Sequence, residues 1–165
     1  MKTVSLRTLL AVFIISCPTF IQSQTVINNL DQVRLMKKFI GTWRCETGRD
    51  TTAYWEFRSF GTGIDSNIKY VTGGRIVSEV KALYGYDKRI DKFISALMVK
   101  GMDIGLFALW FLSETKYEII FYNDLANPEA AYIKTRGEFK SPDLIVVTKF
   151  VNDRPASSLT YTRTD

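Results

Sequence analysis

Phe39-Ile40-Gly41-Thr42-Trp43 stands where the hydrophobic pattern of this 165-residue sequence changes. Before it, apolar residues recur at the spacing of one short amphipathic helix, and Asn28 or Asn29 is placed to cap that helix. After it, apolar and polar residues alternate with a period of two, which is the pattern of β-strands with one buried face. The stretch therefore predicts a helix that packs across the end of an all-β domain.

Short segments with the strand pattern follow one another from residue 41 onward, separated by clusters of Gly, Asn, Asp and Pro. Short connections favour strands that pair in sequence order, and closure of such a meander removes exposed edges. We therefore expect an antiparallel up-and-down β-barrel of about 8–10 strands with a short N-terminal helix. The predicted strands are 41–47, 52–60, 64–71, 75–84, 92–100, 104–112, 116–122, 131–139, 143–151 and 157–163.

Alternation along these strands separates an inner from an outer face, because charged residues fall on one parity in nearly every strand. We assign the other parity, which is apolar, aromatic or hydroxyl-bearing, to the barrel interior. The expected interior residues are Ile64, Ser66, Ile68, Tyr70, Ile76, Ser78, Val80, Ala82, Tyr84, Ala131, Ile133, Thr135, Gly137, Phe139, Leu144, Val146, Thr148 and Phe150.

The segment from Leu106 to Leu112 is apolar on both parities. Two interpretations are open for its second face. Either the N-terminal helix covers it, or it belongs to an interface in which Trp110 takes part, as in a homodimer.

The first 23 residues have the pattern of a signal peptide. Lys2 and Arg7 give a basic start, and the apolar stretch 9–15 is too short to span a bilayer. Cleavage before Gln24 would leave 24–165 as one β-barrel domain in a secreted or periplasmic location. The alternative is a membrane-anchored lipoprotein, because Ile14-Ile15-Ser16-Cys17 resembles a lipobox that would be acylated on Cys17.

The mature chain would keep a single cysteine, Cys45, so no internal disulfide can form and this thiol is expected to be a small buried hydrophobe. Loss of Lys2 and Arg7 lowers the formal net charge from +5 to +3. The remaining basic residues are spread along the chain, so the sequence predicts no nucleic-acid partner.

The sequence contains no histidine. This excludes histidine-ligated haem, histidine-based zinc sites and hydrolases that use a histidine base. The inner parity also offers no pair of carboxylates for acid–base chemistry. We therefore expect no catalytic residue of these kinds, no metal and no cofactor, while an isomerase or cyclase that uses Tyr, Lys or Arg stays open.

Trp43 and Arg163 are the candidates for closing the barrel, because closure places the last strand beside the first. A guanidinium over an indole contributes about 0.5–2 kcal/mol, and it can also donate to carbonyls of the helix or its loop. We expect this pair to close one end, with any binding site toward the opposite mouth; the alternatives are a ligand-anchoring or a surface Arg163. The candidate ligand contacts are the inward aromatic residues Trp55, Phe57, Tyr70, Tyr84, Tyr117 and Tyr161.

The Gly-Thr-Trp stretch, the terminal Arg163 and the meander between them resemble the calycin superfamily of lipocalins and fatty-acid-binding proteins. The run Tyr84-Gly85-Tyr86-Asp87, followed by Lys92-Phe93, is most similar to secreted bacterial lipocalin-like domains of unknown function. The resemblance covers residues 30–165 and implies a barrel with an apolar cavity but no established substrate. The histidine of the haem-binding nitrobindin-like branch is missing, so haem is not implied.

Physically, Gly85-Tyr86-Asp87 predicts the end of a strand and a turn, with a positive φ at Gly85 and a backbone hydrogen bond to Asp87. A ligand role for these residues is the alternative.

The leading functional hypothesis is a secreted or periplasmic binding protein for a small, mostly apolar molecule held inside the barrel. One alternative is an isomerase or cyclase with a titratable group in the cavity. The other is a structural or interaction module with a filled barrel.

Overall fold

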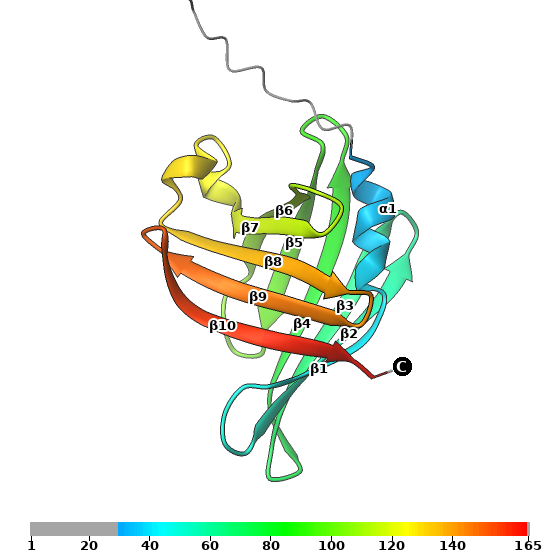
Figure 1. The fold of residues 1–165 in the computed structure, drawn as a ribbon, viewed down its shortest axis with the longest axis vertical. Coiled ribbons are helices and arrows are strands. Elements are labelled where there is room, and N and C mark those ends of the chain that lie inside the picture. The colour runs from blue at the N-terminus through cyan, green and yellow to red at the C-terminus, as the bar shows by residue number, and fades with distance from the viewer. Residues whose placement is uncertain (1–29, 165) are drawn as a thin grey trace, which may run out of the picture.

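The computed structural model describes residues 30–164, which form a closed antiparallel β-barrel (Figure 1). Each strand pairs with the next along the chain, and the last returns to pair with the first. The expected fold class is confirmed, with ten strands in the described part of the chain and one short helix before them. The strands are β1 (Gly41–Glu46), β2 (Thr51–Phe60), β3 (Gly63–Thr72), β4 (Arg75–Asp87), β5 (Lys92–Val99), β6 (Gly105–Phe111), β7 (Lys116–Phe121), β8 (Ile133–Ser141), β9 (Leu144–Val151) and β10 (Arg154–Arg163). The predicted signal peptide and Cys17 lie outside the described residues.

The helix α1 (Gln32–Met36) continues into a 3-10 turn, η1 (Lys37–Phe39), and lies across one end of the barrel (Figure 1). Its N-cap is Asp31, whose carboxylate accepts from the Arg34 amide at 2.9 Å. The expected caps Asn28 and Asn29 precede this position and lie outside the described residues. A cap at Asp31 fits the rule that the capping side chain sits immediately before the first helical residue.

The buried side chain of Gln32 attaches the helix to the end of β6. Its Nε2 donates to the Phe111 carbonyl at 3.1 Å, and its Oε1 accepts from the Phe111 amide at 2.7 Å. A buried amide with both ends paired avoids the cost of desolvating an unsatisfied polar group.

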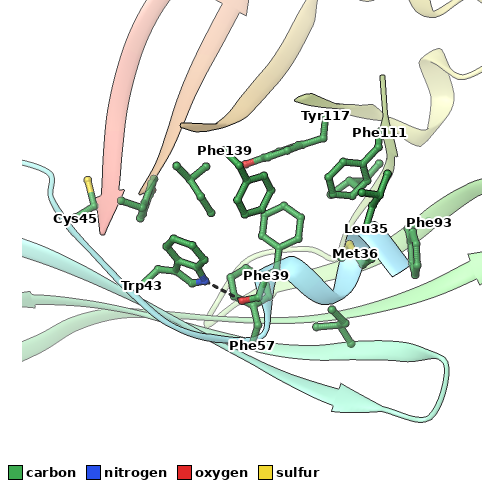
Figure 2. Packing of buried hydrophobic residues seen from close by; sticks show 14 of the residues in the cluster. Leu35, Met36, Phe39, Trp43, Cys45, Phe57, Phe93, Phe111, Tyr117 and Phe139 are labelled. Carbon is green, nitrogen blue, oxygen red and sulfur yellow. Dashed lines mark hydrogen bonds between the residues drawn. The ribbon is translucent and has the colours of Figure 1, made fainter. Parts of the chain in front are cut away.

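Aromatic side chains fill the half of the barrel beneath the helix (Figure 2). Phe39 of η1 is at their centre, and its ring centroid lies 5.3 Å from that of Phe57, 5.0 Å from Tyr117 and 5.1 Å from Phe139. Tilted aromatic pairs of this kind contribute about 0.5–1.5 kcal/mol each beyond the area they bury. Phe39 therefore acts as a plug that joins the helix to the barrel core.

Gly41 and Trp43 make the connection from this plug into β1. Gly41 has a φ of 124°, a region that glycine reaches without the steric cost of a Cβ atom. The indole of Trp43 is fully buried, and its Nε1 donates to the Phe39 carbonyl at 2.8 Å (Figure 2). The Gly-x-Trp spacing therefore combines a sharp change of chain direction with a cap on the turn that precedes it.

Arg163 lies directly opposite Trp43 in the β1–β10 register, with its guanidinium carbon 4.3 Å from the indole centroid. The guanidinium donates to the carbonyls of Lys38, at 3.0 Å, and of Ile40. With the bond from Trp43 to Phe39, the side chains of Trp43 and Arg163 thus pair three consecutive carbonyls, those of residues 38 to 40.

The seam between β1 and β10 is short. Its register comprises Trp43 opposite Arg163 and Arg44 opposite Thr162, extended by the Thr164 amide donating to the Thr42 carbonyl at 2.9 Å. The pairing of β10 with β9, by contrast, runs from Arg154 to Thr162. Closure of the barrel thus depends on few backbone pairs and on the side chains around Arg163.

The predicted interior is correct along β3, but it is wrong for β9. Ile145 is buried and lies opposite Phe139 and Tyr161, so Ile145, Val147 and Lys149 face inward. The side chains expected inside, Leu144, Val146, Thr148 and Phe150, therefore face outward. Both parities are apolar from 144 to 147, so alternation carried no signal, and only the register with the neighbouring strands decides the face.

Ile76 is a second exception to the predicted interior. Its side chain is 55% exposed, because it lies beyond a register shift between Tyr70 and Val71 that changes the pairing of β3 with β4. The extra residue of this β-bulge lies between Ile76 and Ser78 on β4, so Ile76 does not share the face that alternation from Ser78 onward predicts for it.

The middle of the doubly apolar segment at 106–112 is covered on its outer face by another part of the same chain, whereas Leu106 and Leu112 at its ends are exposed. The connection between β7 and β8, which contains η2 (Tyr122–Asp124) and η3 (Pro128–Ala130), packs Leu125 and Ala131 against Ala108, Trp110 and Ile120. The covering segment is therefore this connection and not the N-terminal helix, while an interface in which Trp110 takes part stays a prediction. The same packing also corrects the position of Ala131, which is buried outside the barrel instead of within it.

We predict that Arg163→Met lowers the free energy of unfolding, because it leaves the carbonyls of Lys38 and Ile40 without donors. Each unsatisfied buried group costs about 1–3 kcal/mol. Arg154→Met, at the exposed start of the same strand, is the control and should change stability by less than about 0.5 kcal/mol. Urea denaturation followed by circular dichroism measures both, and equal losses in the two variants would refute a closing role for Arg163.

Candidate functional site

A cavity of about 310 Å³ occupies the barrel interior beyond the aromatic plug. Strands β2 to β10 each contribute lining side chains, and among the described residues none of the lining comes from α1, η1 or β1. Its volume is at the lower end of the range for small-molecule sites, which is about 300–1,000 Å³. The apolar part of the wall consists of Ile68, Leu97, Phe107, Ile119, Val147 and Leu159.

Three of the six predicted ligand contacts line this cavity: Trp55, Tyr84 and Tyr161. The rings of Trp55 and Tyr161 lie against each other, with centroids 4.3 Å apart. The three come from β2, β4 and β10, so the closed barrel is what brings them together.

The other three predicted contacts lie elsewhere in the interior. Phe57 and Tyr117 are buried in the aromatic plug, where both contact Phe39 (Figure 2). Tyr70 is partly buried near Cys45 and is outside the cavity lining. Trp43 and Arg163 are at the closed end, so the cavity lies toward the opposite mouth.

Tyr117 is held in the plug by the strand beside it. It lies opposite Gly137, and a Cβ atom at Gly137 would overlap the phenol ring. The glycine therefore provides the space in which the ring lies across β8, which takes this aromatic residue out of the cavity.

Burial raises the pKa of the Tyr84 and Tyr161 phenols above their usual value near 10, and the thiol of Cys45 adds to the effect at Tyr161. Both phenols therefore stay protonated at neutral pH and are available as hydrogen-bond donors. Ser95 lies directly opposite Tyr84 and adds a second hydroxyl to this part of the wall.

Two polar atoms near the cavity are buried without a hydrogen-bond partner among the described residues: Trp55 Nε1 and Ser66 Oγ. The Ser66 side chain is close to Tyr84 but does not reach hydrogen-bond geometry. Buried polar groups are normally paired, so Trp55 Nε1, whose side chain lines the cavity, is available to donate to a group inside it.

The sequence analysis missed three polar residues of the lining, Ser95, Lys149 and Ser157. Lys149 was assigned to the outer face together with Ile145 and Val147 of β9. Ser157 could not be assigned to a face, because the register of β10 with β9 shifts between Pro155 and Ser157. The observed register places Thr135 and Ser157 opposite Lys149 on the two sides. The signal for this site is Lys149, a charged residue on a face that is otherwise apolar. It can be recognised only when the pairing of β9 with β8 and β10 is known.

The Gly-Tyr-Asp run is at the end of β4, outside the cavity lining. The Asp87 carboxylate accepts from the Arg89 amide at 3.0 Å, which confirms its turn role. Gly85 lacks the expected positive φ, because β4 continues through it to Asp87.

Within residues 30–164, no group of three or more Cys, Asp or Glu side chains is arranged to hold a metal ion. In the same range no helix is long and apolar enough to cross a bilayer. Cys45 is buried, and desolvation raises the pKa of its thiol, which keeps it in the unreactive protonated form.

Fold and cavity together define a closed ten-stranded antiparallel β-barrel, over the described residues, with one filled half and one hollow half. This architecture is compatible with a calycin-like fold. Neither a protein-family model nor a curated protein matches the chain.

The raised pKa of Tyr161 predicts a loss of stability in alkali. Below pH 10 the phenol is protonated in both the folded and unfolded chain, whereas above pH 10 only the unfolded chain loses the proton. The free energy of unfolding then falls with pH by about 1.4 kcal/mol per pH unit for each such tyrosine. Urea denaturation between pH 8 and pH 11 should therefore show a shallower decline of the free energy of unfolding for Tyr161→Phe than for the surface variant Tyr132→Phe. Parallel declines in the two variants would contradict a raised pKa at Tyr161.

Proposed function

We propose that this protein binds a small, mostly apolar molecule inside its barrel. The observation that supports the proposal is the cavity, whose wall combines aliphatic and aromatic side chains with a few hydroxyl groups. Binding sites for small molecules have this composition, in which the apolar wall contributes affinity and the polar groups fix orientation.

The division of the barrel into a filled and a hollow half favours a binding protein over a purely structural module. Phe39 and its neighbours already supply a continuous core at the helix end. The second half is lined by inward side chains that leave space between them, and such a space lowers the stability of the fold. A bound molecule that fills it would offset this cost, which favours a binding role.

An isomerase or cyclase is less favoured by the chemistry of the lining. Such an enzyme needs an acid or base with a pKa near neutrality. Burial moves the pKa of Tyr84 and Tyr161 away from neutrality, which suits hydrogen-bond donation better than proton abstraction.

The binding proposal is tested by filling the cavity. Leu159→Trp enlarges a lining side chain of β10, whereas Thr160→Trp makes the same size of change on the outer face of the same strand. Titration with N-phenyl-1-naphthylamine, a neutral probe that fluoresces in apolar sites, should saturate for the wild type and for Thr160→Trp. Leu159→Trp should weaken binding at least tenfold.

Circular dichroism must show the same fold in all three proteins for the comparison to hold. Two results would contradict a binding function inside the barrel: no saturable fluorescence in the wild type, or equal affinity of both tryptophan variants.

We further propose that the chain is exported, as its N-terminal pattern predicts. Expression of the full sequence in a bacterial host should yield an exported protein whose intact mass corresponds to a start at Gln24. A mass that includes residues 1–23 would refute cleavage, and a diacylglycerol adduct that begins at Cys17 would instead establish the lipoprotein.

A further inference from the structure

A polar row crosses the inner face where the cavity opens. Thr135 of β8, Lys149 of β9 and Ser157 of β10 are direct cross-strand neighbours, and all three line the cavity. The three strands lie side by side in Figure 1, coloured from orange to red. Lys149 and Ser157 are exposed, so this row forms part of the mouth and not of the deep wall.

Lys149 is the charged member of the lining among the described residues. It has no ion pair or side-chain hydrogen bond within 30–164, unlike Lys81 with Asp65, or Lys134 with Asp153. Its positive charge is therefore uncompensated. Low-dielectric walls around such a charge concentrate its field in the opening and attract anions.

A β-bulge contributes to this arrangement. The register shift between Pro155 and Ser157 brings the Ser157 hydroxyl opposite Lys149 on one side, while Thr135 lies opposite it on the other. Two hydroxyl donors beside one ammonium group match the several acceptor lone pairs of a carboxylate, sulfate or phosphate ester.

The deep part of the cavity has the opposite character. Ile68 and Tyr161 are buried there. Apart from Lys149, no ionisable lining group carries a charge at neutral pH, because the phenols of Tyr84 and Tyr161 stay protonated. An apolar tail is stabilised there by about 25 cal/mol for each Å² that it buries. The two regions together fix an orientation, with the tail inside and the charged group at the mouth.

We propose that the ligand is an amphiphile with one anionic oxygen-bearing head group, which Lys149, Thr135 and Ser157 hold at the cavity mouth. This inference rests on the proposed binding function and adds the charge and the orientation of the ligand. Lys149 is then a specificity-determining residue, since it separates anionic from neutral ligands of the same tail length.

The test compares octanoate, octyl sulfate, octan-1-ol and octylamine as competitors of N-phenyl-1-naphthylamine on the mature chain. For the wild type we expect both anions to compete better than the alcohol, and the amine to compete worst. Lys149→Met should weaken both anions about fivefold, the effect of losing one partly exposed charge contact of about 1 kcal/mol, and leave the alcohol unchanged. Lys149→Glu should reverse the order of octanoate and octylamine.

Lys100→Met is the matched control, because Lys100 is an exposed lysine next to the connection between β5 and β6 and does not line the cavity. It should keep the wild-type order, and added salt should reduce the anion preference of the wild type. If octanoate and octyl sulfate compete equally, the site accepts oxyanions in general. If only octanoate competes, the site is specific for carboxylates.

Equal competition by octanoate and octan-1-ol in the wild type, or the same loss in Lys100→Met as in Lys149→Met, would overturn the anion site while leaving the binding function intact. A wild type that does not bind the probe at all would overturn both. Probe affinity in Lys149→Met reports whether the cavity itself is preserved.

Discussion

The rest of the structure depends on the cap that Trp43 and Arg163 place over the junction between helix and barrel. The carbonyls of residues 38, 39 and 40 all point toward these two side chains and accept hydrogen bonds from them. Without that cap the chain could not turn sharply from η1 into β1 while burying its backbone, because buried carbonyls must be paired. The same two residues pair β1 with β10, so one interaction both docks the helix and closes the barrel.

Docking of the helix divides the barrel interior into two halves with different physical roles. Phe39 is inserted from one end and is surrounded by the rings of Phe57, Tyr117 and Phe139, which leaves that half filled. The fold can therefore draw its stability from one end while leaving space at the other. This division makes a hollow interior compatible with a chain of 165 residues.

The sequence predicts the barrel well because period-two alternation and turn residues are local signals that hold in nearly every strand. It also identifies Trp55, Tyr84 and Tyr161 in the cavity wall, because each belongs to a strand with a clear polar face. It fails for Lys149, since the apolar start of β9 has no alternation to read. It fails as well for Phe57 and Tyr117, because the position of Phe39 and the space at Gly137 decide which inward rings form the plug, and neither can be read from alternation.

The seam between β1 and β10 has a consequence for how the chain reaches this structure. Arg163 and Ile40 are 123 positions apart, so the contact that seals the barrel joins opposite ends of the domain. A contact of such long range has a large loop-closure entropy cost, and contacts of this kind slow folding. Gln32 and Phe39 can attach the helix to β6 and to the core, but its junction with β1 gains the Arg163 contacts only once β10 is in place.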